Sequence, residues 1–169
     1  MLHIFNIKSP CDLRQVAQKL IENDVEIWKN SSYTKPKLRT FVTFKQDLTL
    51  EKYVSCYIPK YERSALAKLR CGILPIKIET GRYNHIPEEF RICELCNLNE
   101  IENERHFVCR CTLYNDYRQQ LYNAVCTMYP DFVDLSNEEK FIYLMTHQQI
   151  KLAKYTWKAF QKRTNIMYS

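Results

Sequence analysis

Sulfur and nitrogen donors lie close together in the stretch CELCNLNEIENERHFVCRC, residues 93 to 111. Cys93 and Cys96 are separated by two residues, a spacing at which a tight turn can direct both thiolates at one ion. His106 follows after nine residues and Cys111 after four more, which gives the pattern C-x2-C-x9-H-x4-C. This set suits tetrahedral Zn²⁺ and leaves no open position for a catalytic water. The pattern predicts a structural zinc site.

Cys109 is a second candidate for the last ligand, because the spacing H-x2-C does not exclude it. We favour Cys111, since Phe107 and Val108 can then pack inward before the next helix begins. The alternative to a metal site is a group of reduced cysteines buried in the core.

The composition of the chain limits the classes of protein to which it can belong. Its 169 residues carry a formal net charge of +6, which favours an anionic partner without requiring one. There are only two glycines, Gly72 and Gly81, which argues against a phosphate-binding glycine loop or a dinucleotide fold. We find no secretory signal and no apolar run long enough to span a membrane. We therefore expect a nuclear or cytoplasmic protein that is not secreted, in which clustered thiols bind metal.

The elements that must position the cluster are predicted to be helices. Capping residues, apolar periodicity and a terminating glycine mark most of their ends. The helices are expected from Ser9 to about Trp28, from Asp47 to about Tyr57, over YERSALAKLR before Gly72, from Thr112 to about Met128, from Ser136 past Met145, and from about Gln148 onward. Residues 73 to 87 contain two prolines and are expected to be extended or looped.

These expectations give a mainly α fold, a small helical domain into which a zinc-binding segment is inserted. Residues 1–34 are predicted to form an N-terminal helical arm. Residues 35–169 are predicted to form the zinc-binding domain, with the cysteine segment at 91–112. Proline and serines at the junction break the first helix.

Basic residues recur at helical spacing and could neutralise phosphates. The last helix is expected to carry them opposite an apolar face formed by Ile150, Ala153, Trp157 and Phe160. The candidates for nucleic-acid binding are Lys151, Lys154, Lys158 and Lys162 on that helix, Arg63 and Arg70 on an earlier helix, and Arg82 before the cysteine segment. The alternative is a set of solvated helix faces. Tyr83, next to Arg82, is an equal candidate for base stacking or for the core.

Acidic residues in YPDFVDLSNEEKF invite comparison with a metal-dependent nuclease. Asp131 is followed by Glu138 and Lys140, but nuclease chemistry would place such acids on neighbouring strands. The second half of this segment is predicted to be a capped helix, and acidic residues at a helix start are favoured by the helix dipole. We therefore expect no enzyme activity.

The segments RSALAKLRCGILPIKIETGRY, RICELC, ENERHFVCRCTLYNDYR and EEKFIYLM together resemble the zinc-binding C-terminal tail of non-LTR (LINE-type) retrotransposon reverse transcriptases. The resemblance covers roughly residues 35 to 163. It implies that Cys93, Cys96, His106 and Cys111 are ligands, that Cys109 is not required, and that the tail helps to engage RNA or target DNA beside a reverse transcriptase body. The chain has no YADD-like aspartate pair, so it is expected to lack polymerase activity of its own.

The function expected from the sequence is that of a zinc-stabilised, nucleic-acid-binding accessory module. A zinc-stabilised protein-interaction module, docking on a polymerase or another partner, is the alternative.

Overall fold

The computed structural model describes residues 10–167, and within them helices alternate with loops. No strand is present in this part of the chain, where Ile92 and Ile101 form an isolated antiparallel bridge. The mainly α fold is confirmed. The longer helices and short α-turns are α1 (Pro10–Tyr33), α2 (Phe41–Phe44), α3 (Lys52–Ser55), α4 (Lys60–Arg70), α5 (Lys77–Tyr83), α6 (Asn115–Cys126), α7 (Asn137–His147) and α8 (Gln149–Met167). Short 3-10 turns are η1 (Pro36–Leu38), η2 (Glu88–Phe90), η4 (Thr112–Tyr114) and η5 (Pro130–Asp134), and η3 (His106–Arg110) is a π-helical turn.

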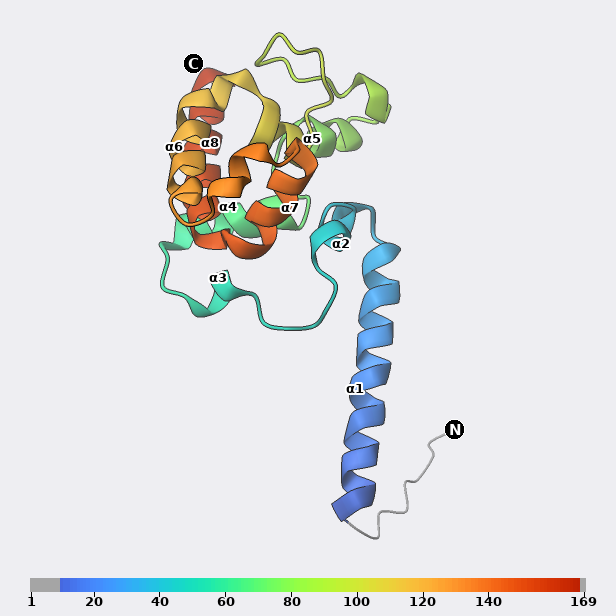
Figure 1. Ribbon diagram of the computed structural model, residues 1–169. Helices are drawn as coiled ribbons and strands as arrows, with labels where there is room; N and C mark the ends of the chain where they lie inside the picture. The colour runs from blue at the N-terminus through green and yellow to red at the C-terminus, as the bar shows by residue number, and fades with distance from the viewer. Residues whose placement is uncertain (1–9, 168–169) are drawn as a thin grey trace.

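Helix α8 is the central element of the body. Helices α4, α6 and α7 pack against it, and the cysteine segment lies at one end of this bundle (Figure 1). Leu66 and Leu69 of α4 and Leu152 of α8 are completely buried. Their removal from water is the main favourable contribution to folding. The core therefore lies between α4, which precedes the cysteine segment in the sequence, and α8, which follows it.

Two local signals predicted helix ends that the structure confirms. Ser136 Oγ accepts a hydrogen bond from the backbone N–H of Glu139 at 3.3 Å, and the Glu139 carboxylate accepts one from the N–H of Ser136 at 2.8 Å. This reciprocal pair satisfies two donors at the start of α7. Gly72 follows α4 with a φ of +64°, and a Cβ there would lie 2.3 Å from the Lys37 carbonyl oxygen. Both conformation and space require glycine at this position.

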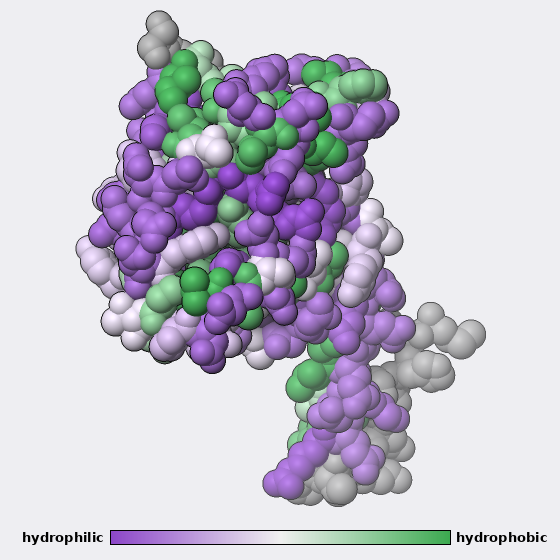
Figure 2. Space-filling model, turned by 45° about the horizontal axis from the view of Figure 1, so that its top comes forward, coloured by the Kyte–Doolittle hydropathy of each residue, from purple (hydrophilic) through white to green (hydrophobic). Residues whose placement is uncertain are grey.

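Helix α1 projects from the body as an arm (Figure 1). It packs against η1 and α2, where the ring of Trp28 meets Phe41 edge-on at 6.3 Å. Farther out, Leu13 and Leu20 are 54% and 53% exposed, and apolar atoms lie open along the arm in Figure 2. The apolar residues of this outer part of the arm are therefore largely exposed to solvent. The helix ends at Tyr33, five residues beyond the predicted end at Trp28. Its predicted start, Ser9, lies outside the described residues.

The helix predicted from Asp47 to Tyr57 is wrong except for the short turn α3. The Asp47 carboxylate accepts hydrogen bonds from the N–H of Thr49 at 2.9 Å and from Lys45 Nζ at 3.1 Å. An aspartate that bonds two residues ahead closes a turn, which competes with helix formation. A further hydrogen bond from the Thr49 hydroxyl does most to lower the pKa of Asp47, which falls to about 2, and the bonds from the Thr49 N–H and Lys45 add to this effect.

The prediction of a loop or extended chain over residues 73 to 87 is wrong for α5. The N–H of Lys77, at the first turn of α5, donates to Glu102 Oε2 at 2.8 Å, and the N–H of Ile78 donates to the Glu102 carbonyl at 3.0 Å. A distant glutamate therefore satisfies the helix start in place of a local capping residue. Ile78 and Gly81 are buried, so packing stabilises a helix that the prolines obscured in the sequence.

The predicted starts and faces of the later helices need smaller corrections. Thr112 does not cap a helix with its side chain, since a tight turn precedes α6, which begins at Asn115 and ends at Cys126. In α8 the buried face is formed mainly by Leu152, Ala153, Thr156 and Ala159. Ile150 remains 39% exposed. The true apolar face is therefore rotated relative to the predicted one.

Candidate metal centre

Four side chains converge where the cysteine segment meets the helical body. The donor atoms of Cys93, Cys96, His106 and Cys111 all lie within 4.8 Å of one another. Cys93 Sγ is 3.9 Å from Cys111 Sγ, and Cys96 Sγ is 3.4 Å from His106 Nε2. All but Cys96 are buried. This is a site that could hold a metal ion.

These separations can be compared with the geometry of a tetrahedral ion. Bonds of about 2.3 Å to sulfur and about 2.1 Å to nitrogen place two sulfurs about 3.8 Å apart and a sulfur and a nitrogen about 3.6 Å apart. The observed separations of 3.9 Å and 3.4 Å agree with this arrangement. Two of the six donor separations therefore match a tetrahedral ion, and since all four donors lie within 4.8 Å of one another, the residues could hold a four-coordinate ion.

The first two donors are brought together by a short antiparallel loop. Around the bridge of Ile92 with Ile101, the N–H of Cys93 donates to the Glu100 carbonyl and the N–H of Glu102 donates to the Arg91 carbonyl, both at 2.9 Å. Asn99 turns the chain with a φ of +53°, a conformation that asparagine tolerates better than most residues. The loop holds Cys93 and Cys96 on one side of the ion site.

The other two donors are positioned by η3, a single π-helical turn. The N–H of Cys111 donates to the carbonyl of His106 at 2.8 Å, so one wide turn separates the two ligands. Asn103 Oδ1 accepts from the N–H of His106 at 2.8 Å and fixes the start of the turn. A turn of this width returns Cys111 to the same side as His106. Such isolated π turns are frequent at functional sites.

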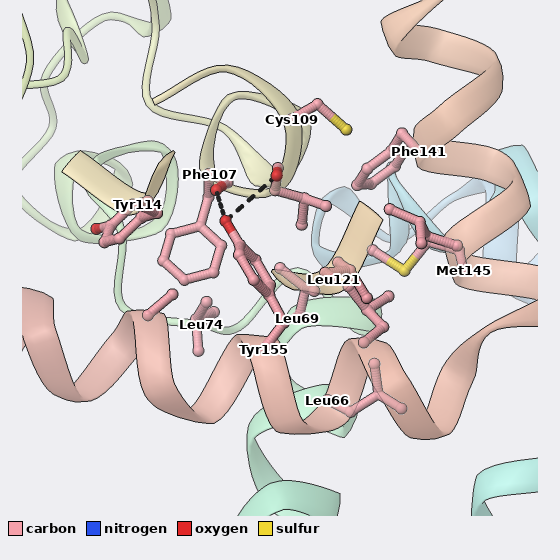
Figure 3. Close-up of a cluster of buried hydrophobic side chains, with 14 of the residues drawn as sticks. Leu66, Leu69, Leu74, Phe107, Cys109, Tyr114, Leu121, Phe141, Met145 and Tyr155 are labelled. Carbon is pink, nitrogen blue, oxygen red and sulfur yellow. Dashed lines mark hydrogen bonds between the residues drawn. The ribbon is translucent and has the colours of Figure 1, made fainter. Parts of the chain in front are cut away.

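Cys109, the alternative fourth ligand, points elsewhere. Its side chain lies in the hydrophobic core near Phe141 and Met145 (Figure 3), and it does not belong to the group of donors that lie within 4.8 Å of one another. Burial raises the pKa of its thiol to about 11, so it stays protonated. Phe107 and Val108 are completely buried, as expected when Cys111 is the ligand. The structure places Cys111, and not Cys109, beside the other three donors.

Glu100 orients the candidate ligand His106. Its Oε2 is 3.0 Å from His106 Nδ1, which leaves Nε2 directed at Cys96. Arg110 forms an ion pair with the same carboxylate, and this contact lowers the pKa of Glu100 to about 2. A carboxylate on the far nitrogen fixes the ring orientation of a metal-binding histidine and increases its basicity. Sequence reasoning missed Glu100, because no spacing rule connects it with His106.

The thiols are held close enough to share a proton. The hydrogen bond with Cys111 and burial raise the pKa of Cys93 to about 12, whereas the same hydrogen bond lowers the pKa of Cys111. Thiolates are the metal-binding form of cysteine. A cation placed among the four donors would favour the thiolate forms, so metal binding would be coupled to proton release.

Two side chains from the helices tie the π turn to the body. Tyr155 Oη of α8 donates to the carbonyls of Phe107 at 2.8 Å and Val108 at 3.2 Å (Figure 3). Arg118 of α6 donates through Nε to the Val108 carbonyl at 3.0 Å and through Nη2 to the Cys111 carbonyl. Both side chains are buried. Neither was recognised from the sequence, because each acts on backbone far away in the chain.

The four lysines predicted to bind nucleic acid all lie on α8, though their environments differ. Lys154 and Lys158 are exposed. Lys151 and Lys162 are half-buried, and their Nζ atoms donate to Gln148 Oε1 at 3.0 Å and to the Leu113 carbonyl at 2.9 Å. The two exposed lysines are therefore the most accessible part of this stripe.

The three candidate arginines are engaged within the protein. Arg63 donates to the Cys56 carbonyl at 3.0 Å, and Arg82 pairs with Glu79 at 2.9 Å beside an exposed Tyr83. Arg70 is buried and pairs with Glu51 at 2.7 Å. Burial withdraws Arg70 from any surface that a phosphate could reach, which corrects its assignment to a basic face.

The acidic residues weighed as a nuclease site serve local roles. Glu138 lies in the first turn of α7 and pairs with Arg105, and Lys140 Nζ donates to the Val133 carbonyl at 2.8 Å. Asp131 lies in the first turn of η5.

Comparison of the chain with family models, with curated proteins and with solved structures finds no match. Within residues 10–167, no helix combines the length and the apolar character needed to cross a membrane.

Proposed function

We propose that the chain is a zinc-stabilised, nucleic-acid-binding accessory module without polymerase activity of its own. One observation carries the proposal: α8 bears both the buried Tyr155 hydroxyl that holds the π turn of the metal centre and the exposed Lys154 and Lys158. The metal centre and the basic surface therefore share a rigid element. Exposed lysines on a helix attract phosphates by releasing condensed counterions.

Zinc is the metal that the donors favour. Three thiolates with one imidazole in a closed, tetrahedral arrangement suit Zn²⁺ and leave no site for substrate. When bound, such an ion contributes folding free energy rather than catalysis. Reduced thiolates require a reducing compartment, so we place the protein in the nucleus or cytoplasm.

The resemblance to the tails of LINE-type reverse transcriptases supports the same proposal. It adds a reverse transcriptase body as a proposed partner, beside which the module would engage RNA or DNA.

A protein-interaction module is the second candidate, and the arm favours it. Leu13, Leu20 and Ile27 recur every seven residues on α1 and are each more than half exposed. Such a stripe suits another helix as partner.

Metal analysis of the purified protein tests the centre. We expect one zinc ion per chain, lost in Cys93→Ser and in His106→Ala but retained in Cys109→Ser, because only the first two remove a ligand. Zinc at full occupancy in His106→Ala would contradict the assignment.

Salt dependence separates the two candidate functions. Binding of generic single-stranded RNA or duplex DNA should weaken steeply between about 50 and about 200 mM salt if phosphate contacts dominate. Binding to a protein partner that is insensitive to salt, without nucleic-acid binding, would favour the interaction module instead.

A further inference from the structure

A basic groove runs between α6 and α8. One hollow of about 230 Å³ is lined by Lys151, Lys154 and Lys158 of α8 and by Tyr117 and Leu121 of α6, among others. A second hollow, around Trp157 and Lys162, shares Tyr117 and Lys158 with the first. Because they share walls, the two hollows lie next to each other along α8, and together they are called the groove.

All the charged side chains that line the groove are positively charged. The residues that line the two hollows include four lysines and no aspartate or glutamate. Lys154 and Lys158 are exposed. Unlike a basic stripe on an isolated helix, these lysines border a concave surface, which concentrates the field on a ligand within it.

Aromatic rings stand at the Trp157 end of the groove. The ring of Trp157 lies 4.7 Å from that of Tyr61, and Tyr61 is 49% exposed. Across the groove, Lys162 Nζ lies 5.6 Å from the centre of the Tyr117 ring. Partly exposed rings beside a row of lysines offer stacking surfaces next to phosphate contacts. This combination is typical of proteins that bind single-stranded nucleic acid.

We propose that the groove between α6 and α8 binds an unpaired nucleotide strand, with phosphates at Lys154 and Lys158 and a base against Trp157. This inference rests on the proposed function and specifies its ligand and its site. A duplex can meet the lysines, but its stacked and paired bases cannot reach a ring on the wall of a groove. The rings therefore select for an unpaired strand.

Intrinsic fluorescence can report directly on the groove, since the chain contains only two tryptophans, Trp28 and Trp157. In full-length, zinc-loaded Trp28→Phe protein, Trp157 is the only tryptophan. We expect its emission to be quenched by an oligo(U) strand and hardly changed by a blunt duplex of equal length. The strand should bind at least tenfold more tightly than the duplex at the same salt concentration.

Matched variants locate the lysines that bind phosphate. In Lys154→Gln/Lys158→Gln, the slope of log affinity against log salt should fall by about 0.7 for each phosphate that the variant no longer neutralises. Lys19→Gln/Lys29→Gln removes the same charge from the arm and should leave the slope unchanged. Trp157→Leu should weaken strand binding on the order of tenfold, the effect expected when one base has no ring to stack on.

The outcomes separate the groove from the broader function. One outcome is that the chain binds strand and duplex equally tightly, with the same salt slope in Lys154→Gln/Lys158→Gln as in the unmodified protein. That result would overturn the proposed binding site in the groove but leave the proposed function standing. No binding of either nucleic acid would overturn both. Equal affinity for poly-glutamate or for anionic phosphatidylserine vesicles would mean a general polyanion surface and would also overturn the inference.

Discussion

Glu100 shows how one carboxylate can organise the metal centre. It contacts the far nitrogen of His106 and is itself held by Arg110. The imidazole is therefore already oriented toward Cys96 by contacts within the protein. A ligand held in its binding geometry loses less conformational entropy when the ion arrives.

Glu100→Gln should weaken zinc binding by about 10- to 100-fold, because the amide is a poorer partner for the imidazole than the carboxylate. A competition titration with a coloured chelator measures this affinity. Glu94→Gln is the matched control, since Glu94 lies in the same loop and pairs with Lys77 outside the donor set. Equal affinities for the two variants would show that Glu100 does not support the site.

The proximity of the four candidate ligands was predictable from the sequence, because spacing alone limits which donors a short loop can bring together. Arg70 shows where such reasoning stops. From its helical spacing, Arg70 was expected on a basic face of the helix. In the structure it lies on the buried side of α4 and pairs with Glu51, which lies outside that helix. Local periodicity does not reveal an ion pair formed between separate elements.

At the scale of elements, the π turn η3 is held by α6 through Arg118. The guanidinium also donates to Asn115 Oδ1 at 2.7 Å, so it bridges the helix and the carbonyls of the turn. A planar guanidinium can make these bonds at once, whereas a single ammonium cannot.

Arg118→Lys should therefore destabilise the zinc-loaded protein by about 1–3 kcal/mol, since the buried Cys111 carbonyl loses the Arg118 donor and the Val108 carbonyl keeps only the bond from Tyr155. Chemical denaturation followed by circular dichroism measures the change. Gln119→Ala, on the exposed side of the same helix, should be nearly neutral. A stability equal to that of the control would mean that other contacts hold the turn.

Helices whose ends are set by neighbouring residues were the most predictable elements. The capping box of α7 and the glycine after α4 are local signals, and both were confirmed. Helix α5 was missed because Glu102 caps it from another segment. The turn at Asp47 shows the opposite error, in which a capping residue bonded to Thr49 and stopped the helix it was expected to start.

At the scale of the whole molecule, the arm and the body are joined through few elements. Trp28 is the residue of α1 whose ring reaches α2. Residues 13–24 of the helix are mostly exposed. The free energy of unfolding of the body should therefore depend little on them.

Deleting residues 1–24 should leave the zinc content unchanged and alter Tm by no more than about 2 °C, since residues 13–24 are mostly exposed and exposed residues contribute little to stability. Trp28→Ala, which removes the packing against Phe41, should lower Tm by a larger amount. Calorimetry of both proteins provides the comparison. A large drop in Tm for the deletion would show that the arm packs on the body.

The projecting arm also determines how the molecule scatters X-rays in solution. A helix of 24 residues is about 36 Å long, whereas a compact chain of this length has a radius of gyration of about 15 Å. The distribution of interatomic distances should therefore have a long tail beyond the peak given by the body. Removing residues 1–24 should shorten that tail and leave the main peak in place.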